Sequence, residues 1–240
     1  MTGSVLRESV SIWSSSHNKR ELLSLRGKEL IAYRAARFFN DGDLVNLGIG
    51  TPTMCADYLP EDVDVLFQSQ NGFIGIGPTP GEGSWDGYVC NASGAPASIV
   101  PEGCCFDSCM SFALIRGGHV NATVLGALEV DQEGNIANWI IPGKRVAGMG
   151  GGMDLVAGAN LVIVTMEHCD KSGNPKVLKK CSLPLTAAGK VNYIVTELCV
   201  LHKTGEGLVL EELAPDVTVD EVLAKTGADL IIPDNIGRMV

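Results

Sequence analysis

Three glycine-rich segments, residues 48–50, 71–78 and 148–153, have the residue types that could hold a ligand. Because glycine has no Cβ, the backbone there can approach a ligand closely and direct its N–H groups toward an anion. The first segment is not a dinucleotide-binding fingerprint, because Thr53 stands where the third glycine belongs, and it lacks the lysine of a phosphate-binding P-loop. One glycine turn is ordinary loop chemistry, but three such segments together predict a ligand cleft.

Cysteine and histidine, which often bind transition metals, do not form a metal-site pattern in this sequence. The cluster Cys104, Cys105 and Cys109 has no matching histidine pair, whereas structural zinc sites combine two closely spaced ligand pairs. We therefore predict no metal site, structural roles for His119 and His168, and reduced thiols in a cytoplasmic protein. The cysteines are Cys55, Cys90, Cys104, Cys105, Cys109, Cys169, Cys181 and Cys199.

The composition excludes several classes of protein. Apolar residues make up 45% of the chain and charged residues 19%, which is too hydrophobic for intrinsic disorder. The net charge of −10 argues against a nucleic-acid partner, because a general phosphate-backbone binder needs a basic face. The longest strongly apolar stretch, residues 155–166, is too short to span a bilayer, so we expect a soluble protein with no membrane partner.

Short apolar runs alternate with helical patterns along the chain. A helix begins at Lys28 and is terminated by Gly42, which suits the left-handed conformation at helix ends. A second helix is predicted through Ala56, and a last one covers residues 219–226. The predicted strands, rich in β-branched residues, are 44–47, 63–67, 122–130, 161–166 and 191–200.

This alternation of strands and helices, with continuous apolar strands, is typical of the α/β class. We predict an open, mainly parallel sheet with helices on both faces. In such sheets ligands bind at the carboxyl ends of the strands, where the glycine-rich segments should lie. No repeat or linker divides the chain, so residues 26–240 are predicted to form a single α/β domain, and residues 1–25 a loosely ordered N-terminal tail.

Residues 67–75, Phe-Gln-Ser-Gln-Asn-Gly-Phe-Ile-Gly, resemble the S-E-N-G signature of one protein family. This family comprises the β subunits of class I CoA-transferases, specifically the 3-oxoacid CoA-transferases. The similarity continues in order through nearly the whole chain after residue 27. The further matching segments are residues 115–120, 125–127, 137–144, 148–155, 164–168 and 181–186.

The resemblance implies a transferase of ketone-body or short-chain fatty-acid metabolism. Such an enzyme moves CoA between an acyl-CoA and a small 3-oxoacid such as acetoacetate, with succinate, acetate or butyrate as the other acid. Coenzyme A is then a substrate, and no cofactor is bound permanently. The family's active site lies between an α and a β subunit, so the resemblance also implies an α-subunit partner and an α2β2 heterotetramer.

The residue at position 70 departs from the family pattern. In the family, the glutamate of S-E-N-G is the covalent nucleophile, and this sequence has Gln70 there. The glutamate carboxylate attacks the acyl-CoA thioester to give a mixed anhydride and CoA thiolate. The thiolate then attacks the glutamyl carbonyl and leaves an enzyme-bound thioester. A neutral carboxamide cannot play this role at a useful rate, so the resemblance implies that Gln70 blocks or cripples turnover.

Other site residues carry over from the family motifs. Gly151 matches the family glycine whose backbone N–H helps to form the oxyanion hole. Asn71 and Gly72 match residues that hold the nucleophile's turn, and they are also predicted to contribute to CoA binding. Further glycines are predicted to shape the CoA and acyl cleft: Gly48, Gly50, Gly75, Gly77 and Gly150. Arg116 is predicted either to pair with a substrate carboxylate or to form a structural ion pair.

Two explanations of Gln70 remain open at this stage. It is either a deliberate substitution made to stop turnover on an otherwise intact scaffold, which the intact surrounding motifs favour, or a natural change to different chemistry. The second explanation includes an acyl-CoA hydrolase or decarboxylase that needs no covalent glutamate and uses Cys55 or Glu167. It also includes a non-catalytic CoA-binding subunit. Assays of CoA exchange, of CoA release without an acceptor, and of binding without turnover distinguish these functions.

Overall fold

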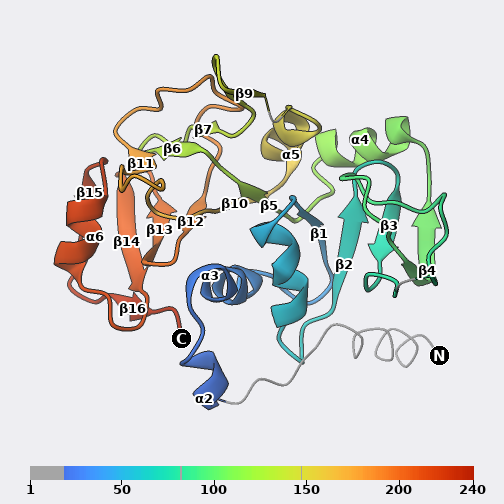
Figure 1. The fold of residues 1–240 in the computed structure, drawn as a ribbon, viewed down its shortest axis with the longest axis horizontal. Coiled ribbons are helices and arrows are strands. Elements are labelled where there is room, and N and C mark those ends of the chain that lie inside the picture. The colour runs from blue at the N-terminus through green and yellow to red at the C-terminus, as the bar shows by residue number, and fades with distance from the viewer. Residues whose placement is uncertain (1–18, 82, 147) are drawn as a thin grey trace.

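The computed structural model describes residues 19–81, 83–146 and 148–240, and its centre is a large mixed sheet (Figure 1). The strand order is β15-β14-β13-β12-β10-β5-β1-β2-β3-β4, and β16 also pairs with β14. The central strands are parallel: β12 (Tyr193–Val195), β10 (Leu161–Thr165), β5 (Ala122–Gly126), β1 (Asp43–Leu47) and β2 (Val65–Ser69). Most of their residues are buried, as is typical of parallel strands covered by helices, and the buried apolar ones include Val45, Phe67, Val124, Ile163 and Ile194.

Antiparallel strands extend the sheet on both flanks. On one side β3 (Phe73–Ile76) pairs with β2 and with β4 (Ile99–Cys105). On the other, β13 (Cys199–Lys203) pairs with β12 and with β14 (Leu208–Leu213). Two short strands, β15 (Leu230–Ile231) and β16 (Gly237–Arg238), pair with β14 in parallel. The predicted α/β class and the mainly parallel central sheet are confirmed.

Helices cover both faces of the sheet, as predicted (Figure 1). On one face lie α3 (Gly27–Ala36) and the 3-10 helix η1 (Thr51–Tyr58), which pack on each other and on the sheet around a core that includes Leu30 and Val45. On the other face lie α4 (Ser108–Arg116) and α5 (Gly152–Gly158), above a second core that includes Ile115 and Leu155. The last helix, α6 (Val219–Lys225), contributes Val222 to the second core.

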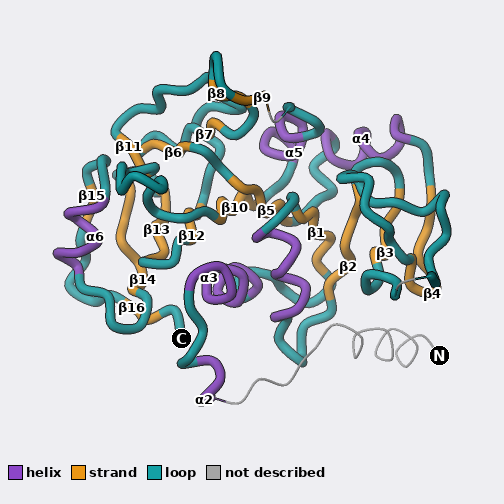
Figure 2. Tube along the Cα trace, viewed as in Figure 1, coloured by secondary structure: helices purple, strands orange, loops and turns teal. Residues whose placement is uncertain are grey.

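Two small sheets complete the fold. One contains β6 (Glu129–Asp131), β7 (Ile136–Ala137) and β11 (Val177–Leu178), and the other pairs β8 (Ile140–Ile141) with β9 (Arg145–Val146). The long loop 77–98 joins β3 to β4, and Figure 2 draws its described residues in teal. In the ranges that the structure describes, no helix is long and apolar enough to cross a membrane.

The N-terminal tail was predicted to end at residue 25. Residues 1–18 lie outside the described residues, but Lys19–Leu22 form the short helix α2. Leu25 is only 7% exposed and belongs to the core beneath α3. Packing against this core therefore begins ahead of residue 26, with Leu25 buried and Leu22 partly buried against it.

Two strand predictions are wrong in the same way. The segment 122–130 forms two strands in different sheets, β5 and β6, and the chain between them leaves the main sheet at Ala127 and Leu128. The segment 191–200 forms β12 and β13, an antiparallel pair joined at 196–198. Both segments are mainly apolar because most residues of both strands in each pair are buried, and the prediction joined the two strands across the short break.

Candidate active site

Gln70 lies directly after β2, in the tight turn that leads into β3. The turn depends on Gly72, whose φ of +138° is rarely adopted by residues with a side chain. A Cβ at this position would also overlap the carbonyl oxygen of Phe106. The Gly72 N–H donates to Ser69 O at 3.0 Å, and the Phe106 N–H donates to Gly72 O at 2.8 Å. The turn is therefore fixed to both β2 and the chain before α4.

Side-chain hydrogen bonds hold the same turn against the loop 77–98. The Ser69 hydroxyl donates to Asn71 Oδ1 at 2.6 Å, and Asn71 Nδ2 donates to Cys90 O at 2.8 Å. The Ala92 N–H donates to Ser69 Oγ at 3.0 Å. With Ser69, Asn71 and Gly72 all engaged, the side chain of residue 70 has a defined direction.

That direction is toward the glycine loop before α5. A Cβ placed on Gly151 would lie 2.9 Å from Oε1 of Gln70 and 3.0 Å from its Cδ, and one on Gly150 would lie 3.8 Å from Nε2. The carboxamide therefore rests against the backbone of both glycines. Neither glycine N–H donates a hydrogen bond to another residue in the described part of the chain. The predicted nucleophile position and oxyanion glycine are thus brought together.

A cleft of 980 Å³ opens at this point, at the carboxyl ends of β1, β2 and β5. This is where open α/β sheets bind ligands, and the volume suits a large organic molecule. Six of the predicted site residues line it: Gly48, Gly50, Gln70, Gly77, Gly150 and Gly151.

The remaining predicted residues lie beside the cleft. Asn71 and Gly72 line a smaller pocket of 180 Å³ instead. Gly75 is absent from the lining of both pockets, and a Cβ there would come within 2.9 Å of the Gly103 Cα. These three residues shape the turn and the close approach of β3 to β4, rather than the wall of the cleft.

The described lining of the cleft is nearly uncharged. Asp57 supplies the one carboxylate along it, and partial burial raises the pKa of this group. The other polar lining consists mainly of amides and hydroxyls, among them Asn91, Ser93 and Asn138. Such a wall can accommodate polar groups of a ligand through hydrogen bonds, while its apolar area can hold an acyl chain.

The predicted alternative nucleophile Cys55 lies outside this lining. Cys55 belongs to η1, and its side chain is fully buried. Burial raises the pKa of the thiol to about 12. Reactive thiols instead have a lowered pKa and access to solvent. Glu167 is exposed but also lies outside the lining. The geometry thus gives neither residue access to a ligand in the cleft.

Arg116 forms an ion pair on the protein surface. Its Nε lies 2.7 Å from Asp154 Oδ1, which links the last turn of α4 to the first turn of α5. Arg116 is also absent from the lining of the cleft. Of the two predicted roles for Arg116, the structure contains the structural ion pair.

Sequence reasoning missed two sets of polar residues at the cleft. Asn46 Nδ2 donates to Gln68 Oε1 at 3.2 Å, and Gln68 Nε2 donates to Ser111 Oγ at 3.1 Å, all buried beneath the site. Asn138 Oδ1 accepts from the Thr186 hydroxyl at 2.6 Å on the opposite wall. The available signal was a polar residue inside an apolar strand, as at Asn46 in β1. Such a residue needs a buried partner.

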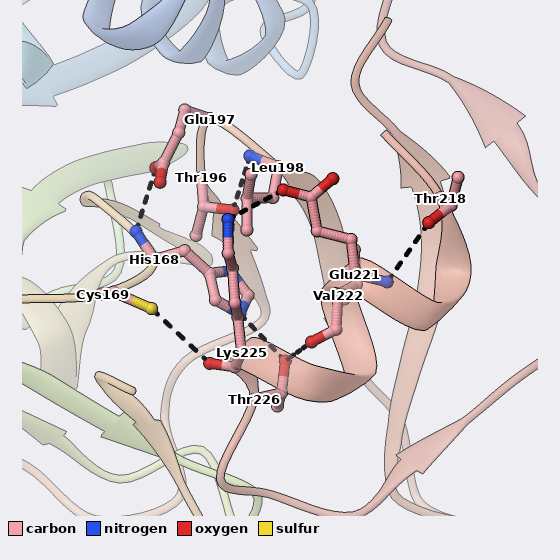
Figure 3. A network of polar contacts seen from close by, with 10 residues as sticks. All are labelled: His168, Cys169, Thr196, Glu197, Leu198, Thr218, Glu221, Val222, Lys225 and Thr226. Carbon is pink, nitrogen blue, oxygen red and sulfur yellow. Dashed lines mark hydrogen bonds and ion pairs between the residues drawn. The ribbon is translucent and has the colours of Figure 1, made fainter. Parts of the chain in front are cut away.

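His168 has a structural role, and Figure 3 shows the surrounding network. The ring is fully buried, with Nδ1 3.0 Å from Thr196 Oγ1 and Nε2 2.9 Å from Thr226 Oγ1. Burial, together with Lys225 and Lys176, lowers the pKa of His168 to about 4, so the ring is neutral. Among the described residues no group of three or more His, Cys, Asp or Glu side chains could hold a metal ion.

The parallel strands, with a glycine-walled cleft at their carboxyl ends, define a ligand-binding α/β protein. A family model described as Coenzyme A transferase matches residues 28–225. The chain belongs to the coenzyme A transferase family.

Two curated relatives share about half of their residues with the chain. The β subunit of the acetate CoA-transferase of Haemophilus influenzae is 55% identical over 215 residues, which is 90% of this chain and 96% of that protein. The corresponding subunit of the succinyl-CoA:3-ketoacid coenzyme A transferase of Helicobacter pylori is 48% identical over 202 residues, 84% of this chain and 97% of the relative. The chain therefore corresponds to nearly the full length of these two subunits.

Solved structures show the same fold. The apoenzyme of an acyl-CoA transferase from Escherichia coli O157:H7 superimposes with a TM-score of 0.71 at 23% identity, over 89% of this chain and 43% of that chain. The decarboxylase AibA/AibB superimposes with a TM-score of 0.64 at 19% identity, over 89% of this chain and 88% of that chain. At these identities the likeness shows the fold alone, so a transferase and a decarboxylase share this architecture.

Proposed function

We propose that this chain is the β subunit of a CoA-transferase that moves CoA between an acyl-CoA and a small 3-oxoacid such as acetoacetate. The second acid is succinate, acetate or butyrate. The relatives named as subunits of acetate and succinyl-CoA:3-ketoacid transferases, at 55% and 48% identity, support this activity and these acids. One observation in the structure carries the proposal: the side chain of residue 70 projects from the end of β2 against the backbone of Gly151.

Each part of the site performs one step of this transfer when residue 70 is a glutamate. The turn at Asn71 and Gly72 holds the carboxylate at the cleft. That carboxylate attacks the acyl-CoA carbonyl, CoA thiolate leaves, and an anhydride remains. The thiolate then attacks the glutamyl carbonyl and expels the first acid, which forms the enzyme thioester. The N–H groups of Gly150 and Gly151 stabilise the oxyanion of each tetrahedral intermediate.

Gln70 interrupts this sequence at its first step, because its amide nitrogen lone pair is delocalised and does not attack a thioester. The neutral carboxamide is nearly isosteric with a carboxylate, so the cleft keeps its shape and its ability to bind CoA. We propose CoA as a substrate that dissociates, with no permanently bound cofactor. The predicted contributions of Gly48, Gly50 and Gly77 to CoA binding also belong to this proposal, and their place in the lining supports them.

The proposed assembly is an α2β2 heterotetramer in the cytoplasm. The relatives are themselves named as single subunits of larger enzymes, the first as a β subunit, which implies an α partner. Exposed apolar side chains adjoin two of the glycine-rich segments: Ile49 is 72% exposed, Val146 70% and Met153 47%. Of these three side chains Ile49 lines the cleft, and exposed apolar patches often mark interaction surfaces. We propose that the α subunit covers this mouth of the cleft.

Restoring the carboxylate tests the function directly. The Gln70→Glu variant, co-purified with its α subunit, should transfer CoA between succinyl-CoA and acetoacetate at an initial rate several orders of magnitude above that of the unaltered chain. Loss of a covalent nucleophile commonly costs about 4 kcal/mol or more in barrier height. Hydroxylamine should trap a thioester at residue 70 after incubation with acyl-CoA alone.

Gln70→Asp is the matched control, because it keeps the charge but withdraws the carboxylate by one methylene. It should exchange CoA far more slowly than Gln70→Glu. Equal rates for Gln70→Glu and the unaltered chain, with no trapped thioester in either, would contradict the proposed function.

A hydrolase or decarboxylase on the same scaffold is the second candidate. The shared fold with a decarboxylase and the missing carboxylate at position 70 favour it. Its predicted nucleophile Cys55 is buried with a raised pKa, which argues against that residue. Release of free CoA or of carbon dioxide by the unaltered complex, without an acceptor acid, would support this candidate. Binding of CoA without any turnover by either form would support a non-catalytic role.

A further inference from the structure

Gln68 and Gln70, which lie at the carboxyl end of β2, have opposite surroundings. Gln68 is 1% exposed, and its carboxamide is hydrogen-bonded at both ends, to Asn46 and to Ser111. Gln70 is half-buried at the cleft, and its carboxamide makes no hydrogen bond to any other described residue. Buried amides are normally hydrogen-bonded within the protein, as that of Gln68 is. The amide of Gln70 is thus left open to whatever occupies the cleft.

The carbonyl of Gln70 also lies beside the glycines that are proposed to form the oxyanion hole. The Cδ and Oε1 atoms lie against Gly151, since a Cβ there would come within 3.0 Å and 2.9 Å of them. Oxyanion stabilisation does not depend on the leaving group, because the N–H donors contact the oxygen that becomes negative. The N–H groups proposed to stabilise the oxyanion of the glutamyl thioester would therefore assist attack on the carboxamide of Gln70 in the same way.

We propose that Gln70 is a modification site, at which the thiol of coenzyme A converts it to glutamate and thereby matures the enzyme. This inference rests on the proposed function, since it uses the same cleft and the same thiol. The CoA sulfur forms a bond to Cδ of Gln70, and the carbonyl electron pair moves to Oε1. The tetrahedral intermediate then breaks its C–N bond. The thiol proton passes to the nitrogen, ammonia leaves, and a glutamyl-CoA thioester remains on residue 70.

The thioester then enters the transfer reaction as its ordinary intermediate. A carboxylic acid attacks the glutamyl carbonyl, CoA thiolate leaves, and an anhydride forms. The thiolate attacks the acyl carbonyl of that anhydride, which releases acyl-CoA and leaves a carboxylate at residue 70. The conversion happens once per chain and is slow, because the thiolate leaves the tetrahedral intermediate more readily than ammonia does. The chain made with Gln70 would thus gain activity only after it has bound CoA.

The neighbouring Asn71-Gly72 pair is a competing site of deamidation with the same mass change. That route requires the Gly72 nitrogen to attack the Asn71 side chain. In the structure the Gly72 N–H donates to Ser69 O, and both ends of the Asn71 carboxamide are hydrogen-bonded. Asn71 is therefore held away from cyclisation, and the change is expected at residue 70.

Peptide mass spectrometry tests the proposal on the complete complex of this chain with its α subunit. Incubation with coenzyme A and acetate should replace –NH2 by –OH at residue 70 progressively, while Gln68 and Asn71 keep their amides. CoA-exchange activity should rise in proportion to the converted fraction. S-methyl coenzyme A, which binds alike but has no thiol, should leave residue 70 unchanged. Gln70→Asn, whose amide is withdrawn by one methylene, should keep its amide with coenzyme A.

Three results would overturn the inference. They are an unchanged residue 70 after prolonged incubation with coenzyme A, conversion at the same rate with S-methyl coenzyme A, and conversion confined to Asn71. None of them affects the proposed function if Gln70→Glu is an active transferase. An inactive Gln70→Glu variant that binds CoA would instead refute the proposed function itself, so the two failures are distinguishable.

Discussion

At position 151 the absence of a Cβ makes room for the side chain of residue 70. A Gly151→Ala variant would bring a methyl group within 2.9 Å of Oε1 and 3.1 Å of Phe112 Cζ. Since α4 fixes Phe112, the side chain of residue 70 must move. In the Gln70→Glu background we expect the exchange rate to fall by about 10²-fold or more, the usual cost of a lost oxyanion contact. Steady-state kinetics measures this. Gly205→Ala, where a Cβ meets nothing within 4 Å, should keep the full rate.

The neutral ring of His168 makes stability depend on pH. Its pKa is about 4 in the folded chain against an ordinary value of 6.5, because burial disfavours the charged ring. As the pH falls below 6.5 the unfolded chain takes up a proton that the folded chain refuses, so the free energy of unfolding decreases until about pH 4. The full effect is about 3 kcal/mol. Urea denaturation of the native chain and of His168→Gln should show this component only in the native chain. Parallel pH curves would contradict the assignment.

The β2–β3 turn is the element on which the site depends most. Gly72→Ala would force a residue with a side chain to adopt a φ of +138° and would place its Cβ against the carbonyl oxygen of Phe106. The N–H of the same Phe106 donates a hydrogen bond to the turn. We expect the Gln70→Glu, Gly72→Ala double variant to lose nearly all exchange and to unfold at a lower temperature, by calorimetry. Gly94→Ala is the control for a side chain at a positive φ, here +78°, without steric overlap, because nothing lies within 4 Å of its Cβ. An equal loss in both variants would show that packing against Phe106 contributes nothing.

The elements could be predicted from the sequence where each one is short and bounded by glycine or a polar cluster. Strands β1, β2 and β10 lie close to the predicted ranges, and helix α3 begins one residue before the predicted start. The helix ends at Ala36 rather than at Gly42, whose φ of +82° belongs to the turn before β1. The segment after Gly50 forms a 3-10 helix rather than an α-helix. The antiparallel flanks begin with short hairpins, since β3 follows β2 across residues 70–72 and β13 follows β12 across residues 196–198. In the second hairpin the polar residues Thr196 and Glu197 mark the break, which the prediction passed over.

The candidate site was likewise only partly predictable from the sequence. The glycine segments and residue 70 were visible as motifs, because backbone approach and turn formation require glycine at fixed positions. The hydrogen bonds of Gln68 and Asn138 were not visible, because their partners Ser111 and Thr186 are tens of residues away in the sequence.

At the scale of the whole molecule, the cleft is bordered by apolar side chains that the described chain leaves exposed. Ile49 is 72% exposed at one edge of the cleft, next to Gly48 and Gly50. An acidic side chain at an exposed position costs the isolated chain little stability. In a buried interface the same charge would be desolvated and unpaired, which is strongly unfavourable. The affinity of an Ile49→Asp variant for the α subunit therefore shows whether a partner covers this edge of the cleft.

We expect Ile49→Asp to weaken association with the α partner by about 10-fold or more, which corresponds to roughly 1.4 kcal/mol. Ile232→Asp, at a 40% exposed residue beside β15, is the matched control and should associate normally. Sedimentation of the co-purified chains gives the assembly, and calorimetric titration gives CoA affinity with and without the α subunit. The unaltered pair should form an α2β2 complex that binds CoA more tightly than this chain alone, because a covered cleft excludes water from the ligand. A stable monomer with the full CoA affinity of the complex would refute the obligate partner.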